Sequence, residues 1–448
     1  MNIIIVGAGR IGTNLSKSLA LENNEVYLIE RNEEKGRKIA EKVDAKLIIG
    51  NGADPETLLK AQVGKADLVL AVTTSDETNL VVCSLAHSFG AKRKIARVRN
   101  TSLSDTLANF GYTHFKIDNI INPELVAAQE IVKTVQTPGA SEVADFADGK
   151  ILLRGFDIPE NSPLCGAKVS DFKDEDFPWP FLIVSIIRKD EVIIPQGETE
   201  LCSKDHIYVL LPVQSLAEFL TYVNPSIKMP KKVVIYGATR TGRHVAEKLS
   251  EKIKDIMLIE EDETAAQNVA GELKGTRIIN GSASEQDILS ECGIEAADAF
   301  IATSNNDHSN LISSVLAKKM GAKITLIMTQ QPDYLSIVDQ LGIDAIINPH
   351  YLAVKQILHL VRGKGISSVT KLLESDMEVL EFIPEAGASI TKAPLKKLKF
   401  PKDSIIGAVH NGENVELANG DTHIQEGQKV IVFCHSSAVK KFQELVTH

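Results

Sequence analysis

The residues with the clearest potential for chemistry are three glycines near the start of the chain, Gly7, Gly9 and Gly12, in the pattern G-x-G-x-x-G. In this pattern the first glycine permits a tight turn, the second lets a pyrophosphate approach the backbone, and the third lets a helix pack closely on a strand. The N–H groups and the dipole at the start of that helix then face the anion. The spacing therefore predicts a nucleotide-binding loop. Its other members are Ala8, Arg10 and Ile11.

An acidic residue follows where a ribose would lie. Glu30 ends the second apolar run of the sequence, 18 residues after Gly12. A carboxylate at this position accepts hydrogen bonds from ribose hydroxyls, and its charge repels a 2′-phosphate. The pattern favours NAD or an adenine ribonucleotide over NADP. Arg31, the next residue, keeps NADP as the lesser alternative.

Polar segments also follow the third and fourth apolar runs, and ligands of α/β sheets bind at the carboxyl ends of strands. The segment GNGAD at 50–54 could line an adenine pocket, and TTSDETN at 73–79 could hold a phosphate or the distal ribose. Ordinary helix capping by Thr74, Ser75 or Asp76 is the alternative for the second segment. The candidate ligand residues here are Asn51, Gly52, Asp54, Thr73, Thr74 and Asp76.

Two arginines end the fifth apolar run. Arg97 and Arg99 are two residues apart, which puts both on the same side of a strand. We expect at least one of them to face the cleft as a partner for phosphate. At the positions that we align with them in the second half of the chain, Ile327 and Thr329, the charge is absent.

The chain repeats itself at an offset of about 230 residues. LVLAVTTSDETNL is echoed by AFIATSNNDHSNL, and NIINPE by AIINPH. Solenoid repeats are much shorter, about 20–50 residues, so the chain is read as two tandem copies of one larger unit.

The second copy keeps only part of the glycine pattern, in the segment VVIYGATRTG. Gly237 and Gly242 remain, but Thr239 replaces the glycine that a pyrophosphate approaches. Glu260 still occupies the ribose position. We expect weaker or altered nucleotide binding in this half, and a purely structural role is the alternative.

Six short apolar runs alternate with helical patterns in the first part of each copy, which predicts a doubly wound, Rossmann-like parallel sheet. After each such part the sequence becomes rich in proline, glycine and short β-like runs, which predicts a small α+β domain. The four expected domains are two α/β domains at 1–136 and 229–363, followed respectively by small domains at 137–228 and 364–448.

Composition excludes several classes of function. The formal net charge of −10 argues against nucleic-acid binding. Five cysteines without a C-x-x-C pair suit a reducing cytosol. We expect no signal peptide, because Met1 leads directly into a strand, and no apolar run approaches the roughly 18–20 residues that cross a bilayer. Any action at a membrane therefore requires a partner.

No catalytic or metal-binding group stands out. Two Y-x-x-x-K strings, at 112–116 and 351–355, resemble a dehydrogenase dyad, and we interpret both as chance. The eleven histidines form no metal-binding pattern. The acidic residues that could suggest a cation are interpreted as a solvated face: Asp145, Asp148, Asp171, Asp174 and Asp176. The sequence thus predicts neither an enzyme nor a metal site.

These segments together resemble the regulator-of-potassium-conductance family, the RCK or KTN domain. The resemblance rests on MNIIIVGAGRIG, LIIGNGADPETLL, AVTTSDETN, KIARVRN and INPE, and with the duplication it covers essentially all 448 residues. It implies a first nucleotide site made of Gly7, Gly9, Gly12, Glu30, Asn51, Asp54, Thr73, Thr74, Asp76 and Arg99. Thr239 departs from the family's glycine, which weakens the implied second site.

The resemblance implies a regulatory protein that binds NAD(H), ATP or ADP in its α/β domains. Members of this family form a cytosolic ring, commonly a homotetramer, beneath a membrane subunit that translocates potassium. We therefore expect a cytoplasmic protein, associated with the inner membrane only through that subunit, whose nucleotide-dependent conformation gates potassium uptake. Two alternatives remain: an NAD-dependent oxidoreductase with an unrecognised substrate, and a soluble redox sensor with another partner.

Overall fold

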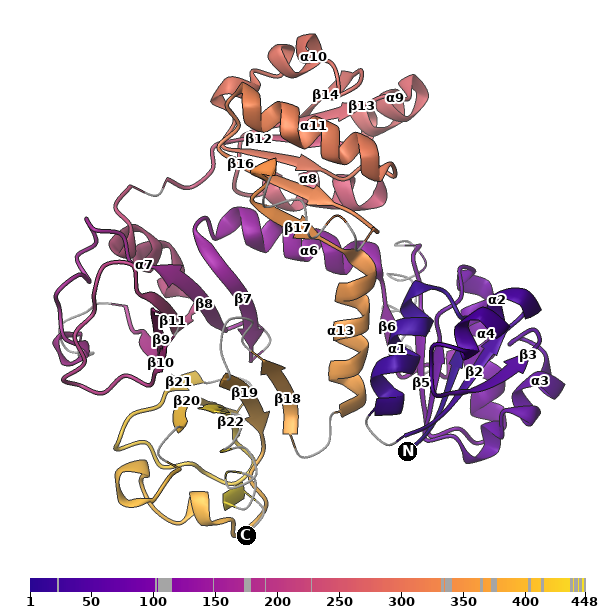
Figure 1. Ribbon diagram of the computed structural model, residues 1–448, viewed down its shortest axis with the longest axis horizontal. Coiled ribbons are helices and arrows are strands. Elements are labelled where there is room, and N and C mark those ends of the chain that lie inside the picture. The colour runs from indigo at the N-terminus through magenta and orange to yellow at the C-terminus, as the bar shows by residue number, and fades with distance from the viewer. Residues whose placement is uncertain are drawn as a thin grey trace. The chain divides into compact units, whose positions relative to one another are not determined.

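The computed structural model (Figure 1) describes most of the 448 residues and divides them into two compact units. One unit comprises Met1–Val132 and Pro230–Leu358, and the other comprises Lys133–Met229 and His359–His448. The structure describes all residues except 22–23, 101–102, 104–114, 148, 173–178, 190, 227, 332–333, 335–340, 363–365, 372–376, 402–403, 412–414, 436–437, 439–441, 443–444 and 447–448.

The first unit contains two six-stranded parallel sheets, which confirms the predicted Rossmann-like fold of both copies. The first sheet has the strand order β3-β2-β1-β4-β5-β6. Its strands are β1 (Asn2–Val6), β2 (Glu25–Glu30), β3 (Lys46–Ile49), β4 (Leu68–Ala71), β5 (Arg93–Arg97) and β6 (Asn119–Ile121). Its helices are α1 (Arg10–Leu21), α2 (Glu33–Ala40), α3 (Pro55–Lys60), α4 (Asp76–Ser88) and α6 (Pro123–Gln136).

The second sheet repeats this order as β14-β13-β12-β15-β16-β17. Its strands are β12 (Lys232–Tyr236), β13 (Asp255–Glu260), β14 (Thr276–Asn280), β15 (Ala299–Ala302), β16 (Ile324–Met328) and β17 (Ala345–Ile347). Its helices are α8 (Arg240–Ser250), α9 (Glu263–Glu272), α10 (Gln286–Glu291), α11 (Asp307–Met320) and α13 (Pro349–Arg362). In both sheets the order reverses beside the first strand, where open α/β sheets bind ligands.

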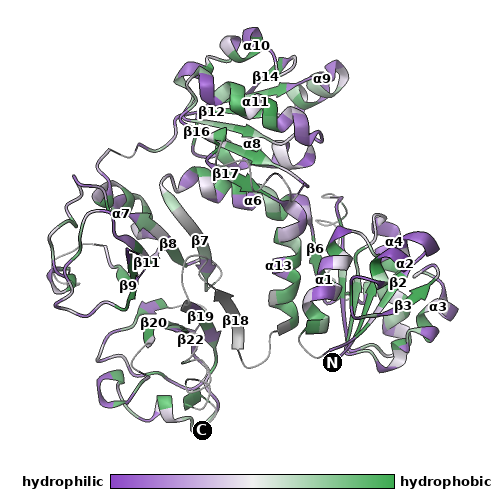
Figure 2. Cartoon of the chain, viewed as in Figure 1, coloured by the Kyte–Doolittle hydropathy of each residue, from purple (hydrophilic) through white to green (hydrophobic). Residues whose placement is uncertain are grey.

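Buried apolar strands explain why both sheets form. Ile3, Ile4 and Ile5 of β1 are at most 1% exposed, since helices cover both faces of a parallel sheet. Helix α1 contributes Ile11, Leu15 and Leu19, spaced four residues apart on one buried face. Figure 2 accordingly shows mostly green strands, while the helices around them carry purple, hydrophilic segments.

A buried asparagine fixes the loop after the fourth strand of each sheet. Asn79, which is fully buried, accepts hydrogen bonds from the backbone N–H and hydroxyl of Thr73 (2.9 and 2.7 Å) and donates to the carbonyls of Thr73 and Arg97 (3.2 and 2.8 Å). Asn310 repeats this pattern with Ser304 and Met328. Each asparagine therefore ties the loop after one strand to the end of the next.

The second unit contains two five-stranded antiparallel sheets, which confirms the prediction of a small domain after each α/β domain. The first consists of β7 (Ala140–Phe146), β8 (Ile151–Asp157), β9 (Leu182–Arg188), β10 (Glu191–Ile193) and β11 (His206–Pro212), and α7 (Leu216–Val223) packs beside it. The second consists of β18 (Ile366–Lys371), β19 (Met377–Phe382), β20 (Ser404–His410), β21 (Val415–Leu417) and β22 (Lys429–His435). Both sheets contribute to one apolar core, which includes Tyr208, Leu210, Ile431 and Phe433.

Replacing either asparagine should destabilise its α/β domain by a similar amount. Asn79→Ala removes the partners of the Thr73 N–H and the Arg97 carbonyl, and Asn310→Ala does the same for Ser304 and Met328. Buried backbone groups left unpaired cost about 1–3 kcal/mol each. We expect each variant to lose about 2–4 kcal/mol in urea unfolding of the full chain. A loss below about 0.5 kcal/mol would contradict this role.

Candidate functional site

Each glycine of the first loop has its own structural reason. Gly7 has a φ of +105°, in the left-handed region that favours glycine. A β-carbon at Gly12 would lie 1.9 Å from the carbonyl oxygen of Gly7, so α1 can approach β1 only because this side chain is missing. A β-carbon at Gly9 would meet nothing within 4 Å. The space in front of Gly9 is therefore open, as the binding of a pyrophosphate requires.

The carboxylate of Glu30 lies beside this loop. It accepts hydrogen bonds from the backbone N–H groups of Ala8 (3.1 Å) and Asn32 (3.0 Å) and from the ammonium of Lys35 (3.1 Å). Burial by itself would raise the pKa of Glu30, but these bonds outweigh it and hold the pKa below its ordinary value. Glu30 is thus a charged acceptor at the end of β2, suited to ribose hydroxyls.

A cavity of about 770 Å³ opens in front of the loop, within the first unit. This volume lies in the range of small-molecule sites. The lining residues that the sequence had predicted are Gly7, Gly9, Arg10, Ile11, Glu30, Arg31, Asn51, Gly52, Thr73, Thr74, Arg97 and Arg99. Its second wall comes from the other half of the chain and contains Thr239, Arg240, Thr241, Asn305, Met328, Gln330, Pro349 and His350.

Several predicted residues lie beside the cavity and have partners within the protein. Ala8 is buried and donates its N–H to Glu30, and Gly12 lies beneath the loop. Asp54 caps α3, with its side chain accepting a hydrogen bond from the N–H of Glu56. Asp76 accepts hydrogen bonds from the backbone N–H groups of Arg99 and Asn100. These residues shape the loops around the cavity, and Ser75 is the residue that caps α4.

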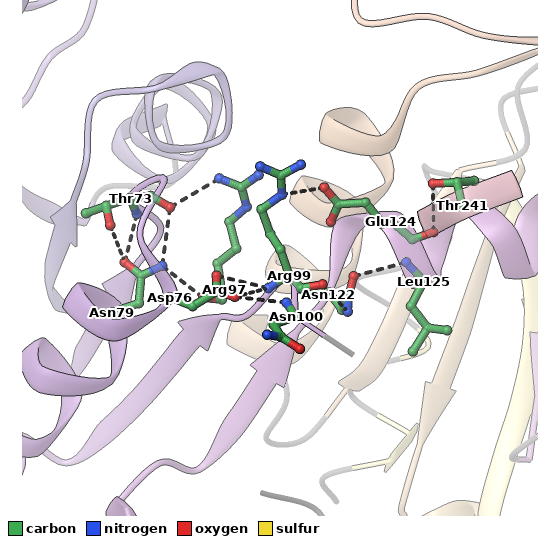
Figure 3. Close-up of polar contacts among 10 residues, drawn as sticks. All are labelled: Thr73, Asp76, Asn79, Arg97, Arg99, Asn100, Asn122, Glu124, Leu125 and Thr241. Atoms are coloured by element: carbon green, nitrogen blue, oxygen red, sulfur yellow. Dashed lines mark hydrogen bonds and ion pairs between the residues drawn. The ribbon is translucent and has the colours of Figure 1, made fainter. Parts of the chain in front are cut away.

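Two arginines bring positive charge to one end of the cavity. In Figure 3 the guanidinium groups of Arg97 and Arg99 lie side by side, between Thr73 and Glu124. Arg97 donates to the carbonyl of Thr73 (3.1 Å), and Arg99 donates from Nε to Glu124 (2.5 Å). Burial, together with Arg99, lowers the pKa of Arg97, while Glu124 and Asp76 act in the opposite direction. The Nε of Arg97 is buried with no partner among the described residues, so this end of the cavity can accommodate an anion.

The expected counterparts of these arginines are displaced by one residue. Strand β5 ends at Arg97 and β16 ends at Met328. The N–H of Gln330 donates to both oxygens of Asp307 (3.2 and 3.1 Å), as the N–H of Arg99 does to Asp76. The predicted alignment with Ile327 and Thr329 is therefore wrong, because the second copy has one extra residue between its second and third strands. The second half still has no charge at either position.

In the second half of the chain, a side chain of the glycine loop caps the helix that follows it. Gly237 has a φ of +98°, like Gly7. Thr239 accepts a hydrogen bond from the N–H of Gly242 (3.1 Å) and donates to the carbonyl of Thr303 (2.9 Å). The hydroxyl thus occupies the helix N-terminus that an anion would use. Glu260 accepts from the N–H of Ala238 (2.6 Å), so the carboxylate is retained.

In the second half of the chain, polar side chains beside the glycine loop bond to one another. Val6, Arg31 and Asn51 line the first cavity, and their counterparts are Tyr236, Glu261 and Ser282. Tyr236 and Ser282 each donate a hydrogen bond to Glu261 at 2.6 Å. Burial and Glu261 raise the pKa of Tyr236 to about 12, so the phenol keeps its proton. None of the predicted second-site residues, Gly237, Gly242 and Glu260, lines the described cavity.

The Y-x-x-x-K strings and the acidic residues considered for a cation lie outside the cavity or outside the described residues. Tyr351, in one of the two Y-x-x-x-K strings, is 62% exposed on α13, and Tyr112 of the other lies outside the described residues. Asp145 pairs with Lys133 and Arg154, and Asp171 accepts from the N–H of Lys168, whereas Asp148, Asp174 and Asp176 lie outside the described residues. The described part of the chain has no group of three or more side chains placed to hold a metal ion, and no helix of membrane-spanning character.

Fold and cavity together define a duplicated protein with two Rossmann-like domains, of the class that binds nucleotides at the carboxyl ends of its strands. The family model described as the TrkA-N domain matches residues 3–123 and 233–349, and the TrkA-C domain matches 153–224 and 379–447. The chain belongs to the TrkA family of potassium uptake proteins, which are regulatory proteins and not enzymes.

Sequence relatives align with almost the whole length of the chain. The chain is 31% identical to the Trk system potassium uptake protein TrkA of Haemophilus influenzae, over 97% of this chain and 95% of that protein. It is 30% identical to the TrkA homolog 1 of Methanosarcina mazei, over 99% of each. Among solved structures, the GsuK channel bound to NAD matches with a TM-score of 0.63 at 18% identity, over 99% of this chain and 78% of that chain. The GsuK structure bound to ADP matches with a TM-score of 0.51 at 14% identity, over 81% and 69%.

Replacing Gly9 should separate binding from stability. Gly9→Ala places a methyl group in the open space, so the chain should fold normally while its affinity for adenine nucleotides falls at least about tenfold. Thr239→Ala is the matched variant of the second loop. It removes a helix cap, at a cost of about 1 kcal/mol, and because Thr239 only contributes to the second wall of the cavity, it should lower that affinity much less than Gly9→Ala does. Calorimetry and thermal unfolding measure the two effects, and equal losses of affinity in both variants would contradict the assignment.

Proposed function

We propose that this chain is the nucleotide-binding regulatory subunit of a potassium uptake system and gates a membrane subunit that translocates potassium. The observation that carries the proposal is the open N-terminus of α1 at Gly9, within a cavity that has a carboxylate at one end and arginines at the other. The names of its relatives, potassium uptake proteins, and the NAD- and ADP-bound states of a channel of the same fold support it.

The proposed ligands are NAD(H), ATP and ADP in the first α/β domain. Glu30 is charged and lies at the end of β2, which suits free ribose hydroxyls and disfavours the 2′-phosphate of NADP. Arg97 and Arg99 favour ligands with more negative charge on their phosphates. An extra γ-phosphate would change the interaction with these two residues, which offers a means to distinguish ATP from ADP.

The second α/β domain is proposed to bind nucleotide weakly or not at all. Thr239 uses the N–H of Gly242, and Tyr236, Glu261 and Ser282 bond to one another beside it. A ligand would have to break these bonds before making its own. The contribution of this domain to the proposed site is the second wall of the first cavity.

Gating follows from the difference in affinity between conformations. A ligand shifts a conformational equilibrium only by the ratio of its affinities for the two states, so no chemical step is needed. The proposed assembly is a homo-oligomeric ring, a tetramer, on the cytoplasmic face of the inner membrane, in contact with the potassium-translocating subunit. The four domain boundaries predicted from the sequence, with divisions after residues 136, 228 and 363, also stand as part of this proposal.

Calorimetric titration of the intact chain with NAD⁺, NADH, ATP and ADP tests the function directly. We expect saturable binding of at least one of them with one site per chain, because only the first loop leaves its helix end open. NADH mixed with small carbonyl compounds should bind without being oxidised. Steady NADH oxidation would favour an oxidoreductase, and the absence of binding by all four at millimolar concentration would refute the proposal.

A further inference from the structure

His350 is a lining residue of the first cavity, although it belongs to the second half of the chain. It lies in the first turn of α13, directly after Pro349. Its counterpart in the first half is Glu124, directly after Pro123 in α6, in the matching segments AIINPH and NIINPE. Both side chains line the same cavity, so the repeat supplies a carboxylate from one half and an imidazole from the other.

The imidazole of His350 has an unused nitrogen. Its Nδ1 is buried and has no hydrogen-bond partner among the residues that the structure describes. The same holds for the Nε of Arg97 and the Oε2 of Glu124, which line the same cavity. Most buried polar atoms of proteins have a partner, and one without a partner requires an explanation. Arg97 Nε is a donor and the imidazole Nδ1 becomes one on protonation, so both fit a ligand with acceptor oxygens, whereas the Oε2 of Glu124 requires a donor.

The charges around His350 are predominantly positive. Arg97 and Arg99 face it from the end of β5, Arg10 from α1, and Glu124 from α6. Arg240 of α8 lines the same cavity. Burial, Arg97 and Arg10 lower the pKa of His350 to about 4, and Glu124 opposes them only in part. Without a ligand, the imidazole is therefore neutral near pH 6.

We propose that His350 is a phosphate-binding residue of the first nucleotide site, contributed by the second half of the chain, and that it takes up a proton when the nucleotide binds. This inference rests on the proposed function. A diphosphate introduces negative charge beside cations that otherwise repel a proton on the imidazole. The protonated ring is a donor at both nitrogens, so Nδ1–H can donate a charge-assisted hydrogen bond to a phosphate oxygen.

The sign of the pH dependence follows from linkage. The pKa of His350 is low in the empty site and higher in the occupied site, so the occupied state binds more protons. Affinity therefore increases as the pH falls through the pKa of the occupied site, and it stops increasing below about pH 4, where the empty site is protonated as well. Between those limits the affinity changes by up to about tenfold per pH unit for one proton.

Calorimetry of the intact chain with NAD⁺ tests this at pH 6.0, in two phosphate-free buffers of different ionisation enthalpy. The pyrophosphate of NAD⁺ keeps its charge between pH 5 and 8, so the protons taken up belong to the protein. We expect uptake of about half a proton to one proton per NAD⁺ in the unchanged chain. His350→Gln, which retains a hydrogen-bond donor but cannot titrate, should lose most of this uptake and bind several-fold more weakly. ADP provides a second probe. With ADP, the difference in proton uptake between the unchanged chain and His350→Gln gives the contribution of His350.

His308→Gln is the matched control, since His308 lies in the same α/β domain, outside the cavity, and its ring bonds to Tyr334. This variant should keep the proton uptake of the unchanged chain. Affinities of the unchanged chain at pH 6.0 and 7.5 provide a test that depends on no variant, and weaker or equal binding at pH 6.0 overturns the inference. Equal proton uptake by the unchanged chain and His350→Gln overturns it while leaving the proposed function intact. Absence of NAD⁺ and ADP binding to the unchanged chain overturns this inference, and only if NADH and ATP also fail to bind is the proposed function overturned.

Discussion

The proposed site depends on one feature, the N-terminus of α1, which the protein leaves open. Gly9 has no side chain to cap this helix, and the space in front of it is empty of protein atoms. Backbone N–H groups at such a helix end attract anions. Glu30, the GNG segment, Arg97 and Arg99 are grouped around this point because the carboxyl ends of parallel strands meet at one edge of the sheet. Without the open helix end, this edge would carry charges with no common ligand.

The duplicated domain shows what happens when the helix end is closed. One substitution at the second glycine position introduces Thr239, which both caps α8 and bonds to the carbonyl of Thr303. The same fold, the same left-handed glycine and the same carboxylate remain. The two domains therefore share one fold but differ at the helix N-terminus, which is open in the first domain and capped by a side chain in the second. Under the proposed function, the first domain binds the regulatory ligand and the second provides a wall of its site.

The sequence predicted the features that depend on local patterns. Both six-stranded sheets, their strand ends and the roles of Gly7 and Gly12 in tight packing follow from periodicity and glycine spacing. Features that depend on side chains from distant segments could not be predicted in this way. Lys35 and His350 were missed, because their approach to the cavity depends on how α2 and α13 pack. The bonds of Tyr236 and Ser282 to Glu261 were missed for the same reason, although a tyrosine before a glycine turn was a visible signal.

Amide hydrogen exchange of the full chain, with and without saturating nucleotide, tests most directly whether the first helix end alone holds the ligand. We expect slower exchange on ligand binding in the segments 7–15 and 73–79, which surround the open helix end. We expect a smaller change in the segment 237–245, where Thr239 already bonds to the N–H of Gly242 and residues 239–241 contribute only to the second wall of the cavity. Equal protection of both glycine loops, or protection of the second loop alone, would contradict the assignment of the site to the first domain.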